Sequence, residues 1–488
     1  MRILRFPLLA FALITGLFLC HDALAAPHRS AAGRHPALSV SKVNAREYMP
    51  TSELRPGMKG YGLTVFKGTK IERFDVTILG VLKKVQYGRD LILVRLNGGP
   101  VTKRYANIIA GMSGSPVYIN GRLVGAVSYG IPFAREPLGF LTPIQDMLEA
   151  WDPDLPQIAS AGGLSASGDT GPAIPASLMI DGRHVTGIRL AAPGTGAFAI
   201  SAGGTLTLTP LMTPLTVTGV SASRLPALAK LLAPLGLRPS QAGSAVPPAG
   251  TQGSAMIPGG AVGVSLATGD LDMTAIGTLT YRRGNKVVAF GHPYAVQPTG
   301  IGPLDAPMFS AYIHDILPSY QSSEKVGSAV RLVGRIFQDR PSAIGGEIGG
   351  KPRMVPIALD IEDRSIKRTR HFRAQVVRHP LITGQLAAFA ASNAIFELHG
   401  QPGDASRHGV QVSRVGREQG RDGPEMKRVV QESTGILGPQ RALGGGGKPK
   451  PAHYRSDHQD RGGEHSVAAP QCGEATAAKT REDGGRGD

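Results

Sequence analysis

Cysteine is almost absent from this chain of 488 residues, which has only two, Cys20 and Cys472. Cys20 lies in an N-terminal segment that we expect to be removed, so no intramolecular disulfide is expected in the mature protein. Acidic residues are outnumbered, and the formal net charge of +17 favours attraction to anionic surfaces, including peripheral association with membranes. Aromatic residues are also few, at 5%. The basic residues are scattered without aromatic neighbours, which argues against a nucleic-acid partner.

The N-terminus has the three parts of a secretory signal peptide. Arg2 and Arg5 precede an apolar run over residues 6–20, and Ala23-Leu24-Ala25 is typical of a cleavage site. The sequence therefore predicts a signal over residues 1–25 and a periplasmic or secreted protein. An uncleaved anchor is the alternative, whereas the bulky Leu19 disfavours a lipoprotein at Cys20. No later segment is long and apolar enough to span a bilayer.

Glycine, proline and short β-rich runs dominate the rest of the chain, which predicts a mainly β protein. Thr142-Pro143-Ile144-Gln145 predicts a capping box that opens a short helix to Trp151. After about residue 405 the composition changes to polar residues and glycine with few aliphatic residues. The tail is therefore expected to be disordered or to be an out-of-frame translation. The expected parts are a signal (1–25), a polar leader (26–48), a first β-barrel half (49–156), an inserted Ala/Gly/Pro/Thr-rich region (157–260), a second β-barrel half (261–400) and the tail (401–488).

The most informative stretch is Gly111-Met112-Ser113-Gly114-Ser115-Pro116. Its glycines allow a tight turn, and the amides of Gly111 and Ser113 are placed to form an oxyanion hole. Ser113 is the candidate nucleophile. Asn120-Gly121 then predicts a type I′ hairpin, which sets the turn on β structure and argues against an α/β-hydrolase. The alternative is a surface turn rich in small residues.

A second stretch, over residues 276–294, predicts two strands around Gly284-Asn285 and ends by projecting His292. A histidine that titrates near neutrality is the usual general base for a serine nucleophile. His292 is the candidate base, and the alternative is a polar residue at a strand end.

These two stretches resemble the SpoIVB serine peptidase family. The serine motif and its hairpin are similar to the family's nucleophile motif, and residues 276–292 are similar to the segment around its histidine. The resemblance covers about residues 50–155 and 260–400. It implies a trypsin-like Ser/His/Asp site between two β-barrel halves. The family's PDZ module is not recognisable.

The sequence departs from the family in two ways. The histidine segment precedes the serine in the sporulation enzyme, whereas Ser113 comes before His292 here, an order that a triad defined by geometry tolerates. The family's acid lies about fifteen residues before the serine, where this chain has Asn97-Gly98. The acid is therefore left open among Asp90, Asn97, Asp270, Asp272 and Asp305.

We expect an exported serine endopeptidase that cleaves protein or peptide substrates through an acyl-enzyme. Neither a cofactor nor a metal is expected, because no nucleotide or ligand motif is complete. The first alternative is a catalytically inactive, protease-like envelope protein that binds peptides or partner proteins. The second is an envelope scaffold unrelated to proteases.

Overall fold

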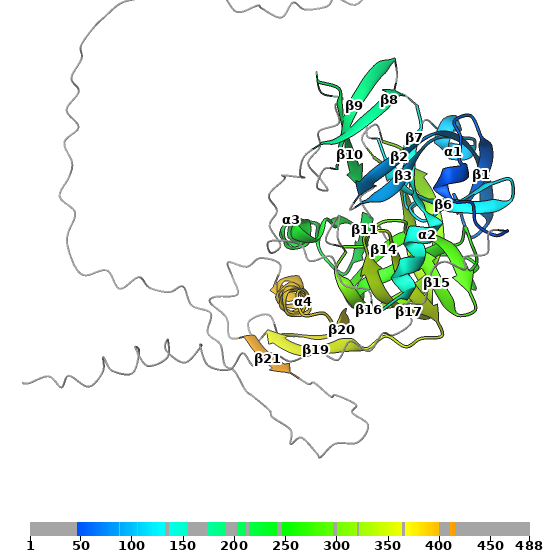
Figure 1. The fold of residues 1–488 in the computed structure, drawn as a ribbon. Coiled ribbons are helices and arrows are strands. Elements are labelled where there is room, and N and C mark those ends of the chain that lie inside the picture. The colour runs from blue at the N-terminus through cyan, green and yellow to red at the C-terminus, as the bar shows by residue number, and fades with distance from the viewer. Residues whose placement is uncertain are drawn as a thin grey trace, which may run out of the picture. The chain divides into compact units, whose positions relative to one another are not determined.

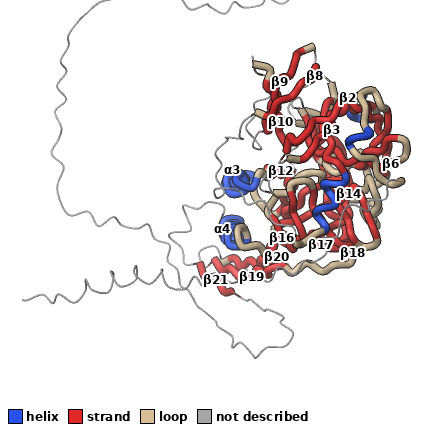
Figure 2. Tube along the Cα trace, in the orientation of Figure 1, coloured by secondary structure: helices blue, strands red, loops and turns tan. Residues whose placement is uncertain are grey.

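The computed structural model describes residues 46–86, 88–104, 106–131, 136–154, 173–180, 182–190, 201, 203–210, 214–241, 246–295, 300–319, 322–363, 367–399 and 410–414. The expected signal, nearly all of the polar leader and nearly all of the tail lie outside the described residues. Strands dominate the described residues (Figure 2), which confirms the mainly β prediction. No helix in these ranges is both long and apolar enough to cross a membrane.

The first half of the described chain forms a closed barrel. Its strands neighbour one another in the order β1-β2-β3-β7-β6-β5, and β5 pairs with β1 to close the ring. A short helix, α1 (Gly99–Lys103), and the two-residue strand β4 (Ile109–Ala110) lie in the connection from β3 to β5. The barrel strands are β1 (Lys59–Val65), β2 (Ile71–Gln86), β3 (Arg89–Asn97), β5 (Pro116–Ile119), β6 (Arg122–Gly130) and β7 (Leu138–Pro143).

A second closed barrel repeats this topology. The neighbour order is β13-β14-β15-β18-β17-β16, and β16 pairs with β13. Both barrels thus follow the order first-second-third-sixth-fifth-fourth, and the expected pair of barrel halves is confirmed. The strands are β13 (Ala261–Gly269), β14 (Asp272–Arg283), β15 (Lys286–Ala289), β16 (Gly302–Leu317), β17 (Ser323–Arg340) and β18 (Ala343–Ile348).

The segment between the barrels adds strands to both of them. β10 pairs with β6 and extends the first sheet through β9 and β8, whereas β11 and β12 extend the second sheet from β14. Helix α4 packs against β19 and β20 (Figure 1). The elements between the barrels are β8 (Ile174–Ile180), β9 (Arg183–Leu190), β10 (Thr205–Pro210), β11 (Pro214–Thr218), α3 (Leu225–Leu232) and β12 (Arg238–Gln241). The elements that follow the second barrel are β19 (Met354–Asp363), β20 (Arg368–Val377), α4 (Thr383–His399) and β21 (Val410–Arg414).

The two hairpin turns follow from their glycines. Asn120 and Gly121 have φ of 50° and 76°, as a type I′ turn requires at both central residues. Gly284 has φ of 58°, and the φ of Asn285 is not positive, so this turn has the glycine-first form of type II′. Both turns match their sequence predictions.

The predicted capping box is wrong. Pro143 is itself the N-cap of α2 (Ile144–Leu148), and no side chain caps this end. The Thr142 hydroxyl instead donates to the Gly291 carbonyl at 2.6 Å. The helix continues as a short 3₁₀ turn, η3 (Glu149–Trp151), so its end at Trp151 agrees with the prediction.

Strand β6 contributes side chains to two hydrophobic cores. Val124 and Val127 belong to the core of the first barrel, whereas Leu123 and Ala126 pack with residues of the second barrel, including Val288. A strand that is buried on both faces needs apolar residues along its whole length, which accounts for the run Leu-Val-Gly-Ala-Val. Because β6 also borders the serine turn, it ties the site to both barrels.

Candidate active site

The serine turn follows β4, which pairs in parallel with the start of β17 in the second barrel. Gly111 and Gly114 have φ of 95° and 91°, in the region that side chains rarely adopt. At Gly114 a side chain is excluded for a second reason. A Cβ there would lie 2.0 Å from the Thr278 carbonyl oxygen and 2.5 Å from the Phe290 nitrogen. The glycines predicted to shape this turn are therefore required by its backbone and its packing.

Strand β14 holds the carbonyl groups of the turn. The Thr278 hydroxyl donates to Gly111 O at 2.9 Å, and the Thr278 amide donates to Ser113 O at 2.9 Å. The Thr280 hydroxyl donates to Gly114 O at 2.7 Å. These buried hydrogen bonds fix three peptide groups of the turn, so its geometry depends on the second barrel.

The amides of the turn have different roles. Those of Met112, Gly114 and Ser115 donate to backbone carbonyls at 2.8–2.9 Å. The amide of Ser113, by contrast, donates to no acceptor in the described part of the chain. An oxyanion hole at a candidate nucleophile needs such a free amide.

His292 lies directly against Ser113. Its Nε2 is 2.8 Å from Ser113 Oγ, and both side chains are buried, with 0% and 2% exposure. Phe290 and Gly291, with φ of 72° and 73°, turn the chain after β15 so that His292 points at the serine. The bond from Thr142 to Gly291 O fixes this turn from the first barrel. The structure thus brings together the predicted nucleophile and the predicted base.

A backbone carbonyl occupies the other side of the imidazole. His292 Nδ1 lies 2.7 Å from Pro293 O, so the geometry assigns the proton to Nδ1 and leaves Nε2 free to accept from Ser113. Burial lowers the pKa of His292 to about 4, although the bond to Pro293 raises it. The imidazole is therefore neutral near pH 7, as a base must be before it accepts a proton.

In the described part of the chain, the five candidate acids bind residues other than His292. Asp90 accepts from Lys83 and Thr51, Asn97 accepts from the Gly98 amide, and Asp270 accepts from the Arg373 amide. Asp272 accepts from Thr274, and Asp305 pairs with Arg335 and Arg353.

Asp339 is a residue that the sequence analysis missed. It is fully buried at the end of β17 and accepts three backbone amides, from Tyr294, Ala295 and Ile301, at 2.7–3.1 Å. Burial raises its pKa to about 7, and the three amides lower it. It fixes the chain that follows His292 and Pro293, so it is a positioning residue. Neither spacing nor a motif distinguishes this aspartate in the sequence.

Lys325 is the second missed residue, and it lies beneath the serine turn. Its stem would be 3.1 Å from a Cβ at Gly111, and its Nζ donates to Thr64 Oγ1 at 2.7 Å. Thr64 Oγ1 is in turn 3.3 Å from Thr278 Oγ1, which holds Gly111 O. Burial lowers the pKa of Lys325 to about 7. A basic group thus supports the turn from inside the protein.

The topology shows how the serine can precede the histidine. Ser113 lies between β3 and β5, the third and fourth strands of its barrel, and His292 lies between β15 and β16, the third and fourth of the other. The two residues occupy equivalent connections of two equivalent barrels. Exchanging the barrels along the chain would exchange the order of the residues and leave the pair unchanged.

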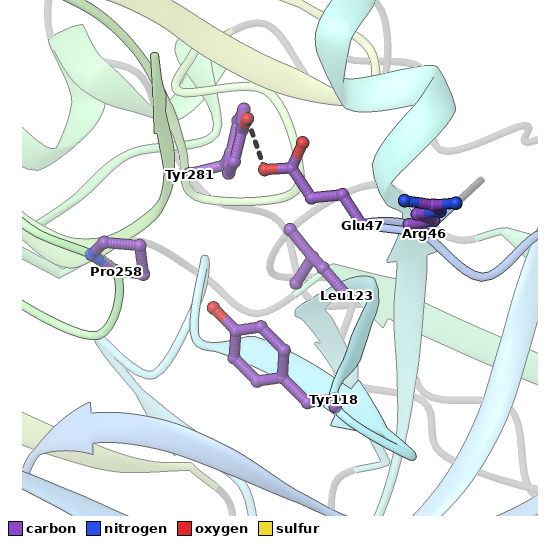
Figure 3. Close-up of a pocket in the computed structure, with 7 residues that line it drawn as sticks. Arg46, Glu47, Tyr118, Leu123, Pro258 and Tyr281 are labelled. Carbon is purple, nitrogen blue, oxygen red and sulfur yellow. Dashed lines mark hydrogen bonds between the residues drawn. The ribbon is translucent and has the colours of Figure 1, made fainter. Parts of the chain in front are cut away.

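An open pocket that neither Ser113 nor His292 lines is shown in Figure 3. It is lined by Arg46 and Glu47, which precede the first strand, by the β5–β6 hairpin, and by Pro258 and Tyr281. Glu47 accepts a hydrogen bond from the Tyr281 hydroxyl at 2.6 Å. No group of side chains that could hold a metal ion occurs within the described ranges.

Two barrels with a Ser–His pair between equivalent connections resemble the arrangement of chymotrypsin-like serine hydrolases. Residues 44–148 match the family model described as SpoIVB peptidase S55. This confirms the predicted resemblance to the SpoIVB peptidase family for the barrel that carries Ser113, and it supports a SpoIVB-type peptidase, which acts on proteins. No curated protein and no solved structure matches the chain.

Proposed function

We propose that this protein is an exported serine endopeptidase of the SpoIVB kind. The observation that carries the proposal is the 2.8 Å contact between Ser113 Oγ and His292 Nε2, made by residues 179 positions apart on separate barrels. Exported location rests on the N-terminal sequence alone. Mass spectrometry of the native protein should find Ala26 as its first residue, and retention of residues 1–25 would instead favour an anchor.

The reaction follows from the hydrogen bonds of the site. His292 Nε2 accepts the hydroxyl proton as Ser113 Oγ attacks the peptide carbonyl, and the amides of Ser113 and Gly111 stabilise the oxyanion. The protonated imidazole then donates this proton to the leaving amine, and the acyl-enzyme remains. Water, deprotonated by His292, attacks the ester carbonyl and releases the acid and the free serine.

Pro293 O takes the position that an aspartate holds in a triad. A carbonyl fixes the tautomer and orientation of the imidazole, but it lacks the full negative charge that stabilises the imidazolium. We therefore expect a slower enzyme than one with a complete triad. Changing the triad aspartate to asparagine in chymotrypsin-like proteases lowers kcat by about 10⁴-fold.

The second candidate function is a catalytically inactive protein that binds peptides. Two observations favour it, namely the burial of both side chains and the carbonyl in the acid's position. Labelling with a fluorophosphonate separates the two functions, because only an activated serine reacts.

The matched variants are Ser113→Ala, His292→Ala and Ser115→Ala. Ser115 is a suitable control because it lies two residues from the nucleophile and is buried, and its Oγ has no partner among the described residues. We expect Ser113→Ala to abolish labelling and Ser115→Ala to retain it. Residues that act as a unit should give a Ser113/His292 double mutant that cleaves protein hardly more slowly than either single mutant. A folded protein that is labelled neither as the wild type nor in the variants described below that open the site would establish the inactive alternative.

A further inference from the structure

One edge of β6 leads directly to the serine turn. At the start of β6 this edge pairs with β5, as far as Ala126. Val127, the next residue, exchanges hydrogen bonds with the turn: its carbonyl accepts from Gly114 at 2.8 Å and its amide donates to Ser115 O at 3.0 Å. Two residues farther on, about 7 Å at the usual rise of a strand, β10 takes the same position.

β10 must lie on this edge because the other edge is occupied. Tyr129 and Gly130 pair with Phe140 and Gly139 of β7 on that side. They also pair with Pro210 and Thr209 of β10, which leaves only the edge of the serine turn. The pairing is antiparallel, so β10 runs in the direction from Gly130 towards Val127 and thus towards Ser113.

The same residues of β6 also contact the histidine. The Tyr129 ring centroid is 6.3 Å from that of His292. A Cβ on Gly291 would lie 3.1 Å from Val127 O and 3.3 Å from Ser128 Cβ. An extended peptide added to β6 at residues 129–130 would therefore arrive between the nucleophile and the base. Addition of a strand to a free sheet edge is a common way of binding peptides.

β10 is held at this edge more by apolar packing than by its backbone pairing with β6. Its ladder with β6 has only two residue pairs, and Pro210 has no amide to donate. Four parallel pairs join it to β9, and Leu206 is buried with Val185, Ile188, Tyr129 and Phe140 in one cluster. The backbone contact is thus weak, whereas the apolar docking of β9 and β10 is substantial.

From this arrangement we propose that strand β10 of the inserted region blocks the edge of β6 to which a peptide substrate would bind. β10 takes the position of the substrate residues that precede the scissile bond. This inference rests on the proposed peptidase function. Burial of both Ser113 and His292 agrees with a closed state. Protein substrates must displace β10 from β6 before they are cleaved, and an extended chain segment is the form that fits the vacated edge.

A reversible cross-link tests the proposal directly. Thr209 and Gly130 face each other across the antiparallel ladder, at a Cα separation of about 4.5–5.5 Å that suits a disulfide. The double variant Thr209→Cys/Gly130→Cys is made in the full chain with Cys472→Ser. We expect the oxidised protein to be at least tenfold slower than the same protein after reduction in cleaving unfolded β-casein. Equal rates would overturn the proposal.

A second variant releases the contact instead of fixing it. Leu206→Asp places a charge in the cluster that docks β10, and Arg183→Asp is the control, an exposed residue in β9. If about one molecule in ten is open at equilibrium, release raises the apparent rate about tenfold. We expect faster casein cleavage and faster fluorophosphonate labelling in Leu206→Asp only. A folded Leu206→Asp protein that is no faster than the control contradicts the proposal.

The same experiments distinguish the self-blocking proposal from the peptidase function on which it rests. If the wild-type protein is labelled and the oxidised cross-linked protein cleaves as fast as the reduced one, the peptidase stands and the self-blocking is wrong. If neither the reduced variant nor Leu206→Asp is ever labelled at Ser113, both proposals are wrong.

Discussion

Replacing Gly114 by alanine should damage the serine turn far more than the same change in another left-handed turn. Gly114 has φ of 91°, and its Cβ would meet backbone atoms of Thr278 and Phe290. Gly121 is the matched control. It has φ of 76° in the hairpin that follows, and a Cβ there would meet no atom within 4 Å.

The difference between the two variants isolates the steric term. Both changes carry the backbone cost of an alanine with positive φ, about 1–2 kcal/mol. At Gly114 the new carbon would lie 2.0 Å from the Thr278 oxygen, so the turn and β14 must separate by more than 1 Å at the usual contact distance of about 3.5 Å. That movement breaks the three bonds from Thr278 and Thr280, each worth about 1 kcal/mol. We expect Gly114→Ala to cost about 3 kcal/mol more than Gly121→Ala.

Urea unfolding measures this difference, and fluorophosphonate labelling measures the geometry of the turn. Gly121→Ala should unfold with a midpoint slightly below that of the wild type and keep its labelling rate. Gly114→Ala should lose labelling even under conditions where it stays folded. Equal midpoints for the two variants would refute the view that β14 clamps the serine turn.

Two further predictions follow from buried titratable groups. Burial lowers the pKa of His292 to about 4, so kcat/KM should stay level from pH 7 to about pH 5 and fall only below that; an acid limb near pH 6.5 would show that water reaches the imidazole in the reactive state. The pKa of Lys325 is lowered from 10.5 to about 7, so the folded state binds fewer protons than the unfolded state between these values, and stability should rise with pH across this window. Lys325→Met should remove that slope from urea midpoints measured at pH 7 and pH 9.5, and an unchanged slope would contradict it.

Much of the fold was predictable because it depends on local signals. Glycines marked the hairpin turn at Asn120-Gly121, and short β-rich runs marked a mainly β fold. The Ser–His pair was predictable from two motifs. The sequence could not show that Thr142 bonds to Gly291 O instead of capping a helix, because that bond joins residues 149 positions apart.

The third partner of the site escaped prediction for a related reason. A search for an acid considers only side chains, whereas His292 is oriented by the backbone carbonyl of Pro293. Every residue has a backbone carbonyl, so the sequence does not reveal this role. Asp339 was equally hidden, because its role comes from three amides that converge only in the folded chain. Backbone groups leave no signature in a pattern of residue types.

The repeated topology accounts for the exchanged order of the serine and the histidine, but not for the missing acid. Each barrel offers one connection between its third and fourth strands, and the two connections meet where the barrels face each other. A nucleophile placed on one and a base placed on the other meet in either chain order. Such an exchange does not account for the missing acid, because a residue a fixed distance before the serine moves with the barrel that carries Ser113. At that distance this chain has Asn97, whose oxygen accepts from the amide of Gly98. The orienting group comes instead from Pro293, the immediate neighbour of the base, and that contact moves with His292 wherever its barrel lies in the chain.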